Sequence, residues 1–71
     1  MPRLPKAREV ILVAHKLGFV FARQKGSHAI YRHNNGVRIT VPIHGGREIS
    51  PAVFHQILED MKIDAQEFWE F

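Results

Sequence analysis

The dipeptide Asn35-Gly36 constrains the fold of this chain more than any other sequence feature, because it separates two runs with the composition of β-strands. Both residue types tolerate positive φ, and Asn-Gly between such runs is a strong short-range signal for a β-hairpin. Residues 37–43 alternate apolar and polar side chains, which predicts a strand with one buried and one wet face. With a two-residue loop, His28 would oppose Ile43 and lie at the rim of the apolar face, partly shielded from water.

The remaining patterns complete an α-β-β-β-α order. An apolar stripe predicts a first helix over residues 6–17, with Gly18 as a left-handed cap. Strands are expected over residues 19–24, 28–33 and 37–43. Ser50 fits the N-cap of a second helix that begins at Pro51 and ends near residue 61, and Asp64 fits the N-cap of a short last helix. The predicted class is α+β: a three-stranded antiparallel sheet with two helices on one face plus a short C-terminal helix.

Length and composition bound the protein class. The 71 residues predict a single domain, spanning residues 1–71, with a modest core. The chain has no cysteine, which fits a cytoplasmic localisation, and we expect neither a signal peptide nor a membrane span. Nine of the ten Lys and Arg precede Glu48, whereas six of the seven acids lie at or after it. A solvated surface explains this basic part as well as a polyanion partner does.

The stretch Lys25-Gly26-Ser27-His28 carries the candidate chemistry. A histidine can take and give a proton near neutral pH, and RNA phosphodiester cleavage can use a base, an acid and a cation on the phosphate. From the residues alone, a strand histidine that only packs or hydrogen-bonds is the more frequent case. Lys25, Arg23 and Arg32 are candidate phosphate ligands or simply a charged surface. Ser27 is equally compatible with contacting a phosphate and with forming the turn.

The sequence does not identify a second acid–base residue. His44, Tyr31 and Lys25 are low-ranking candidates, and Tyr31 should face away from His28 and is more expected to pack than to stack on a base. The loop over residues 44–47 is more typical of a connector than of an anion site. The histidines show no metal-ligand spacing, so we expect neither a metal nor a cofactor. The tail Phe68-Trp69-Glu70-Phe71 is expected to pack rather than to form a patch for a partner.

Several segments together resemble the HicA family of small toxins, over about residues 6–63. The segments are Gly18-Phe19, Arg23-Gln24-Lys25-Gly26-Ser27-His28, Pro42-Ile43-His44, Glu48-Ile49 and Ile57-Leu58. The resemblance implies a fold like the double-stranded-RNA-binding domain (dsRBD-like), and a toxin endoribonuclease, or mRNA interferase, that a HicB-type antitoxin neutralises. It implies that His28 is the catalytic residue, acting on single-stranded mRNA. The sequence departs from the family pattern at Pro51-Ala52-Val53 and at Lys62, where the family often has a glycine.

Two other interpretations stay open at this point. The first is a non-catalytic RNA-binding module on the same fold. A duplex-binding domain places lysines at the start of its last helix, whereas the second helix here starts with Ser50-Pro51-Ala52-Val53, which argues against duplex binding. The second is an interaction protein anchored by the aromatic tail.

Overall fold

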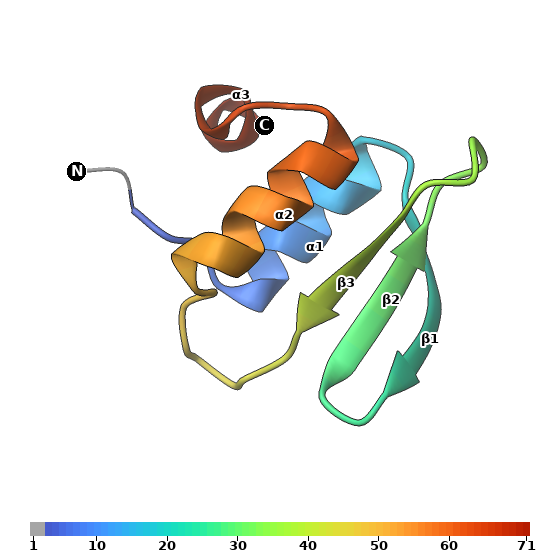
Figure 1. The fold of residues 1–71 in the computed structure, drawn as a ribbon, viewed down its shortest axis with the longest axis horizontal. Helices are drawn as coiled ribbons and strands as arrows, with labels where there is room; N and C mark the ends of the chain where they lie inside the picture. The colour runs from blue at the N-terminus through green and yellow to red at the C-terminus, as the bar shows by residue number, and fades with distance from the viewer. Residues whose placement is uncertain (1–2) are drawn as a thin grey trace.

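The elements follow the order α-β-β-β-α with a short last helix, which confirms the predicted fold class (Figure 1). The computed structural model describes residues 3–71. Its elements are α1 (Ala7–Lys16), β1 (Val20–Lys25), β2 (His28–Arg32), β3 (Arg38–Pro42), α2 (Pro51–Met61) and α3 (Ala65–Glu70). The strands form an antiparallel sheet in the order β1-β2-β3. Helices α1 and α2 lie on one face of this sheet, and α3 lies beyond them, away from the strands (Figure 1).

The ends of the helices form as the sequence predicts. Ser50 Oγ accepts a hydrogen bond from the backbone N–H of Val53 at 3.3 Å, which caps α2. The Asp64 carboxylate accepts from the N–H of Glu67 at 2.8 Å, and the Glu67 carboxylate accepts from the N–H of Asp64 at 3.0 Å. Gly18 follows α1 with a φ of +97°, a conformation that glycine adopts without a Cβ clash.

The second hairpin loop is one residue longer than predicted. The N–H of His33 donates to the carbonyl of Val37 at 2.8 Å, so residues 34–36 form a three-residue loop. Gly36 ends this loop with a φ of +95°, the left-handed residue that three-residue hairpin loops use. The side chain of Asn35 stabilises the turn by accepting from the N–H of Val37 at 2.9 Å. The asparagine and the glycine therefore form a hairpin, but not a two-residue one.

The longer loop shifts the register by one residue and changes the position of His28. His28 pairs with Pro42, and not with Ile43 as predicted. Because side chains alternate along a strand, a shift of one residue exchanges the two faces. The buried face of β2 and β3 carries Ala29, Tyr31, Ile39 and Val41. His28 is exposed on the other face, so the prediction of a partly shielded histidine at the rim of the core is wrong.

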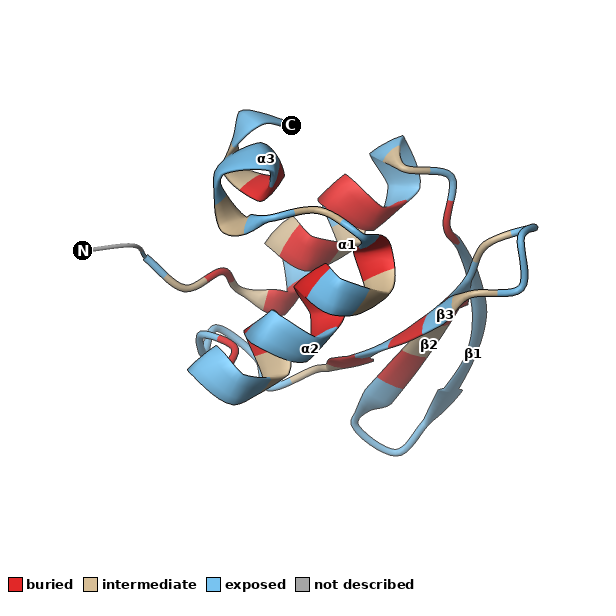
Figure 2. Ribbon diagram, turned by 45° about the horizontal axis from the view of Figure 1, so that its top comes forward, coloured by how far each residue is buried: buried red, intermediate tan, exposed pale blue. Residues whose placement is uncertain are grey.

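The core lies between the sheet and the helices and continues beneath α3 (Figure 2). Its most deeply buried side chains include Val10 of α1, Val41 of β3, Ile57 of α2 and Phe68 of α3. The Phe68 ring packs edge-to-face on Phe54, with ring centroids 5.0 Å apart. None of the helices within residues 3–71 combines the length and hydropathy needed to cross a membrane.

The tail packs as expected at two of its aromatic residues. Phe68 is buried, and the half-buried Trp69 contacts the core and carries the guanidinium of Arg3 over its ring at 4.1 Å. Phe71 remains 45% exposed.

Candidate functional site

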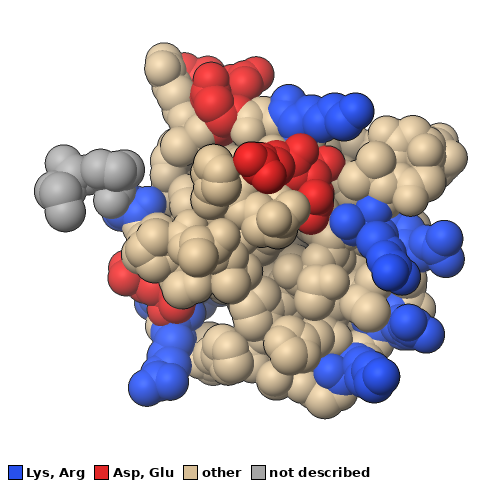
Figure 3. Space-filling view, in the orientation of Figure 1, with Lys and Arg blue, Asp and Glu red and all other residues tan. Residues whose placement is uncertain are grey.

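The face of the sheet that the helices leave uncovered carries a histidine and four basic residues. In the strand register, Lys25 opposes His28 and Arg32 opposes Arg38. Directly opposed residues share a face, as do alternate residues of one strand. We call these five residues, all of which are exposed, the basic sheet face: Arg23, Lys25, His28, Arg32 and Arg38. In Figure 3, Lys and Arg side chains gather on the strand side of the molecule, at the right.

An irregularity in β1 directs Arg23 and Lys25 to this face. Phe21 opposes Tyr31, but Arg23 opposes the next residue of β2, Ile30, so Ala22 is an extra residue in the ladder. In a regular strand Arg23 would share the face of Phe21, which contacts Tyr31 on the helix side of the sheet at a centroid distance of 5.6 Å. The bulge thus exchanges the faces for the second half of β1.

The cations of the basic sheet face lack carboxylate partners within residues 3–71. The ion pairs of this part of the chain join Arg3 to Glu9 at 2.7 Å and His55 to Glu59 at 3.1 Å. Neither pair lies on the sheet. An exposed cluster of like charges without counter-ions attracts polyanions and positions phosphate groups.

The turn before His28 fixes the start of β2. Gly26 and Ser27 form a two-residue loop between Lys25 and His28, with Gly26 at a φ of +59°. The Gln24 side-chain amide donates to the carbonyl of Gly26 at 3.0 Å. The carbonyl of Ser27 accepts from the N–H of Ile43 at 2.6 Å, which holds the turn against the end of β3. His28 therefore begins a strand that is hydrogen-bonded on both sides.

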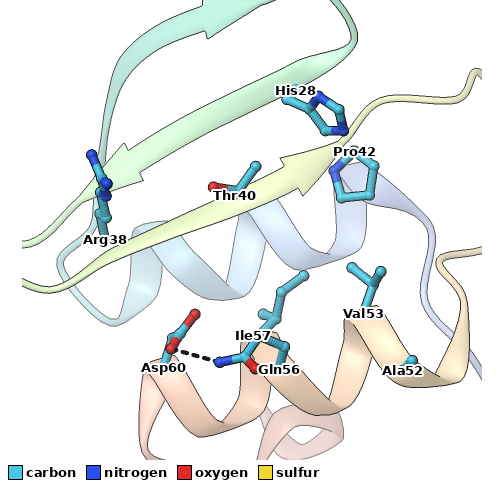
Figure 4. A pocket seen from close by; sticks show the side chains of 9 residues that line it. All are labelled: His28, Arg38, Thr40, Pro42, Ala52, Val53, Gln56, Ile57 and Asp60. Carbon is cyan, nitrogen blue, oxygen red and sulfur yellow. Dashed lines mark hydrogen bonds between the residues drawn. The ribbon is translucent and has the colours of Figure 1, made fainter.

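Two cavities meet at His28. The first, of about 480 Å³, lies between β3 and α2 and is shown in Figure 4; we call it the β3–α2 groove. The second, of about 540 Å³, extends toward the loop that follows β3 and is lined by His44 and Arg47. His28, Pro42 and Val53 line both cavities. The His28 imidazole is thus accessible from a groove on each side.

The structure brings most of the predicted site residues together. Arg23, Lys25 and Arg32 share a face with His28, and the exposed Ser27 precedes His28 in the turn. His44 lines the second cavity together with His28. Tyr31, in contrast, is only 7% exposed on the opposite face, which confirms that it packs and removes it as an acid–base candidate.

The sequence interpretation missed three residues of the basic sheet face and the β3–α2 groove. Arg38 belongs to the basic sheet face, and the alternating pattern of β3 had already placed it on the wet side. Gln56 and Asp60 of α2 line the β3–α2 groove (Figure 4), and no local sequence signal marks them. Within residues 3–71, no cluster of three His, Asp or Glu side chains is arranged to hold a metal ion.

The comparison with protein families gives one match. A family model described as the HicA toxin of bacterial toxin–antitoxin systems matches residues 7–63. This range contains the basic sheet face, both cavities and helices α1 and α2, whereas α3 lies outside it. No individual curated protein matches the chain.

Proposed function

Because the chain belongs to the HicA family of toxins from bacterial toxin–antitoxin systems, we propose that it is an endoribonuclease that cleaves single-stranded mRNA and so arrests translation. The observation that carries this proposal is the basic sheet face, on which His28 lies among four cations without carboxylate partners within residues 3–71. A strand of RNA laid across this face would meet phosphate ligands on both sides of an exposed imidazole.

The proposed reaction uses the neighbouring 2′-hydroxyl as nucleophile. A base removes the proton of the hydroxyl, its oxygen bonds to phosphorus, and the leaving 5′-oxygen takes up a proton. His28 serves as one of these proton-transfer groups. Lys25, opposite His28 in the ladder, stabilises the charge that develops on the phosphate, and Arg23 and Arg32 hold the flanking phosphates. Ser27 donates a hydrogen bond to the phosphate, and no protein-bound metal takes part.

His44 is the best-placed second acid–base group of this proposal. It is exposed and lines the second cavity together with His28, so a phosphate at the mouth of that cavity could contact both rings. Arg47 lines the same cavity and adds a further cation.

The antitoxin partner completes the proposal. A toxin of such a system has an antitoxin, and we assign this one to the HicB type. It neutralises the toxin by covering the basic sheet face with a complementary acidic surface, which excludes RNA from His28. Since the substrate is mRNA, the pair acts in the cytoplasm. Addition of the antitoxin should protect RNA and shield His28 from chemical modification, and unchanged modification of His28 in the complex would contradict this arrangement.

The activity is tested with purified protein and single-stranded RNA in the presence of a chelator. His28→Ala should lower the cleavage rate by about 10²-fold or more, the usual contribution of a general acid or base. His44→Ala should give a smaller loss. His55→Ala is the matched control, because His55 is exposed on α2 and lines neither cavity at His28. Equal rates for the parent and His28→Ala would contradict the assignment. Tight RNA binding by the parent without cleavage would favour the non-catalytic module.

A further inference from the structure

The β3–α2 groove is lined by both apolar and polar side chains, which come from a strand and a helix. One face of α2 supplies Val53, Gln56 and Asp60, which follow the i, i+3, i+7 spacing of a helical stripe, with the buried Ile57 behind them. The opposite side is lined by strand residues, which are His28, Arg38, Thr40 and Pro42 (Figure 4). The groove therefore has an apolar middle with polar groups along both edges.

The Gln56 amide is held in a defined orientation. Its Nε2 donates to Oδ1 of Asp60 at 3.1 Å, and Figure 4 shows this contact along the helix edge of the groove. A carboxylate only accepts hydrogen bonds, so the amide nitrogen must face Asp60. The amide of Gln56 then has its carbonyl oxygen and its second N–H available for a ligand, and this acceptor and donor lie in one plane. This is the pattern with which a glutamine reads the edge of a nucleobase.

The charge distribution favours a base over a phosphate in this groove. Asp60 and Arg38 both line the groove and give it one charge of each sign, so it has no excess positive charge to attract a phosphate, whereas Arg23, Lys25 and Arg32 lie on the basic sheet face outside it. A nucleobase is flat, uncharged and polar only at its rim, which suits an apolar middle with hydrogen-bonding groups along the edges. The volume of about 480 Å³ lies within the range of small-ligand pockets, roughly 300–1,000 Å³.

We propose that the β3–α2 groove binds the base of a nucleotide adjacent to the scissile phosphate, and that Gln56, oriented by Asp60, reads the edge of this base. The inference rests on the proposed function, because His28 at the mouth of the groove fixes the distance between the read base and the bond that breaks. Backbone phosphates bind to the basic sheet face, which is indifferent to sequence, and the groove supplies the base preference. The ligand class is a single-stranded RNA base.

The test measures base frequencies next to the cleavage site. Parent protein cleaves RNA with a randomised segment, and sequencing of the product ends gives the base frequencies on both sides of the broken bond. The parent should favour certain bases at one flanking position. Gln56→Ala should lower the ratio between the most and least favoured base there by roughly tenfold, because one bidentate contact typically supplies discrimination of this size. Gln56→Glu, which lacks the N–H, should change which base is favoured.

The control is Gln66→Ala on α3. Gln66 makes the same type of i, i+4 contact, with Nε2 donating to Oε2 of Glu70 at 3.5 Å, but it does not line the groove. It should leave the base frequencies unchanged.

Three outcomes are decisive. Unchanged frequencies in both Gln56 variants, with cleavage still dependent on His28, overturn the inference and leave the proposed function intact. A parent without base preference at either flanking position does the same. Absence of His28-dependent cleavage overturns the proposed function itself, and the inference with it.

Discussion

At the scale of single residues, the position of His28 follows from contacts on both sides of its strand. Lys25 opposes it across the first hairpin and Pro42 across the second, so backbone pairing on both sides fixes the face of the sheet on which the side chain lies. Because the backbone is already fixed, only the side-chain torsions of His28 have to adjust for the imidazole to contact a bound phosphate. Its exposure means that the neighbouring cations and the bound RNA, rather than the protein core, would form the environment of the reaction.

A second residue, Lys62, has a strained backbone conformation that lowers the stability of the fold. Lys62 ends α2 with φ +62° and ψ +40°, the left-handed conformation that strongly favours glycine. Lys62→Gly should therefore raise the free energy of unfolding by about 1 kcal/mol, as measured by urea denaturation. Lys62→Ala is the control, because it removes the charge but keeps the Cβ, and it should leave stability nearly unchanged. A Gly variant no more stable than the Ala variant would show that the left-handed cap carries no strain.

At the scale of elements, the sequence predicted the features that depend on contacts between residues a few positions apart. Helix caps such as Ser50 and Asp64 act through contacts three residues away, and both were predicted correctly. The loop over residues 34–36 was not, because Asn-Gly is compatible with two-residue and three-residue hairpins and only the pairing of His33 with Val37 distinguishes them. The bulge at Ala22 depends on how β1 fits against β2, and no local pattern encodes it.

The sequence therefore predicted which residues belong to the candidate site better than it predicted where their side chains lie. The residue types around Lys25-Gly26-Ser27-His28 pointed to phosphate chemistry, and three of the predicted ligands do share the face of His28. The exposure of His28 was predicted wrongly, because one extra loop residue exchanged the faces of the hairpin. The groove residues Gln56 and Asp60 come from α2, and only the tertiary packing of α2 beside β3 brings them into one groove with His28.

The basic sheet face makes a prediction about salt dependence. RNA binding is measured at several salt concentrations with His28→Ala, whose slower cleavage should leave the RNA largely intact during the measurement. Each phosphate contact contributes roughly 0.7 to the slope of log K against log salt concentration for a single strand. Replacing Arg38 or Lys25 with alanine should lower the slope by about this amount. Arg8→Ala is the control, since Arg8 is an exposed cation on α1, outside the sheet. Equal slopes for the Arg8 and Arg38 variants would show that the sheet does not carry the RNA.

At the scale of the whole molecule, the two faces of the sheet differ in burial: one packs against helices and the other is exposed. Helices α1 and α2 bury one face of the sheet and supply the core, whereas the residues of the basic sheet face are exposed (Figure 2). Because α3 packs on the outer side of α1 and α2, its contribution should be to stability rather than to the site.

This division of tasks predicts that stability and activity separate at Phe68. Phe68 is 1% exposed and packs against Phe54, so Phe68→Ala should lower the free energy of unfolding by about 3–5 kcal/mol, a large share of what a domain of this size has. The matched control is Phe71→Ala, because Phe71 is 45% exposed and should change stability by about 0.5 kcal/mol or less. Denaturant unfolding measures both.

The fraction of Phe68→Ala that remains folded should retain the parent's RNA binding per molecule, since α3 lies on the far side of the helices from the basic sheet face. If Phe68→Ala unfolds at the same denaturant concentration as the parent, α3 is dispensable to the core; if its folded fraction loses RNA binding, α3 acts on the site as well.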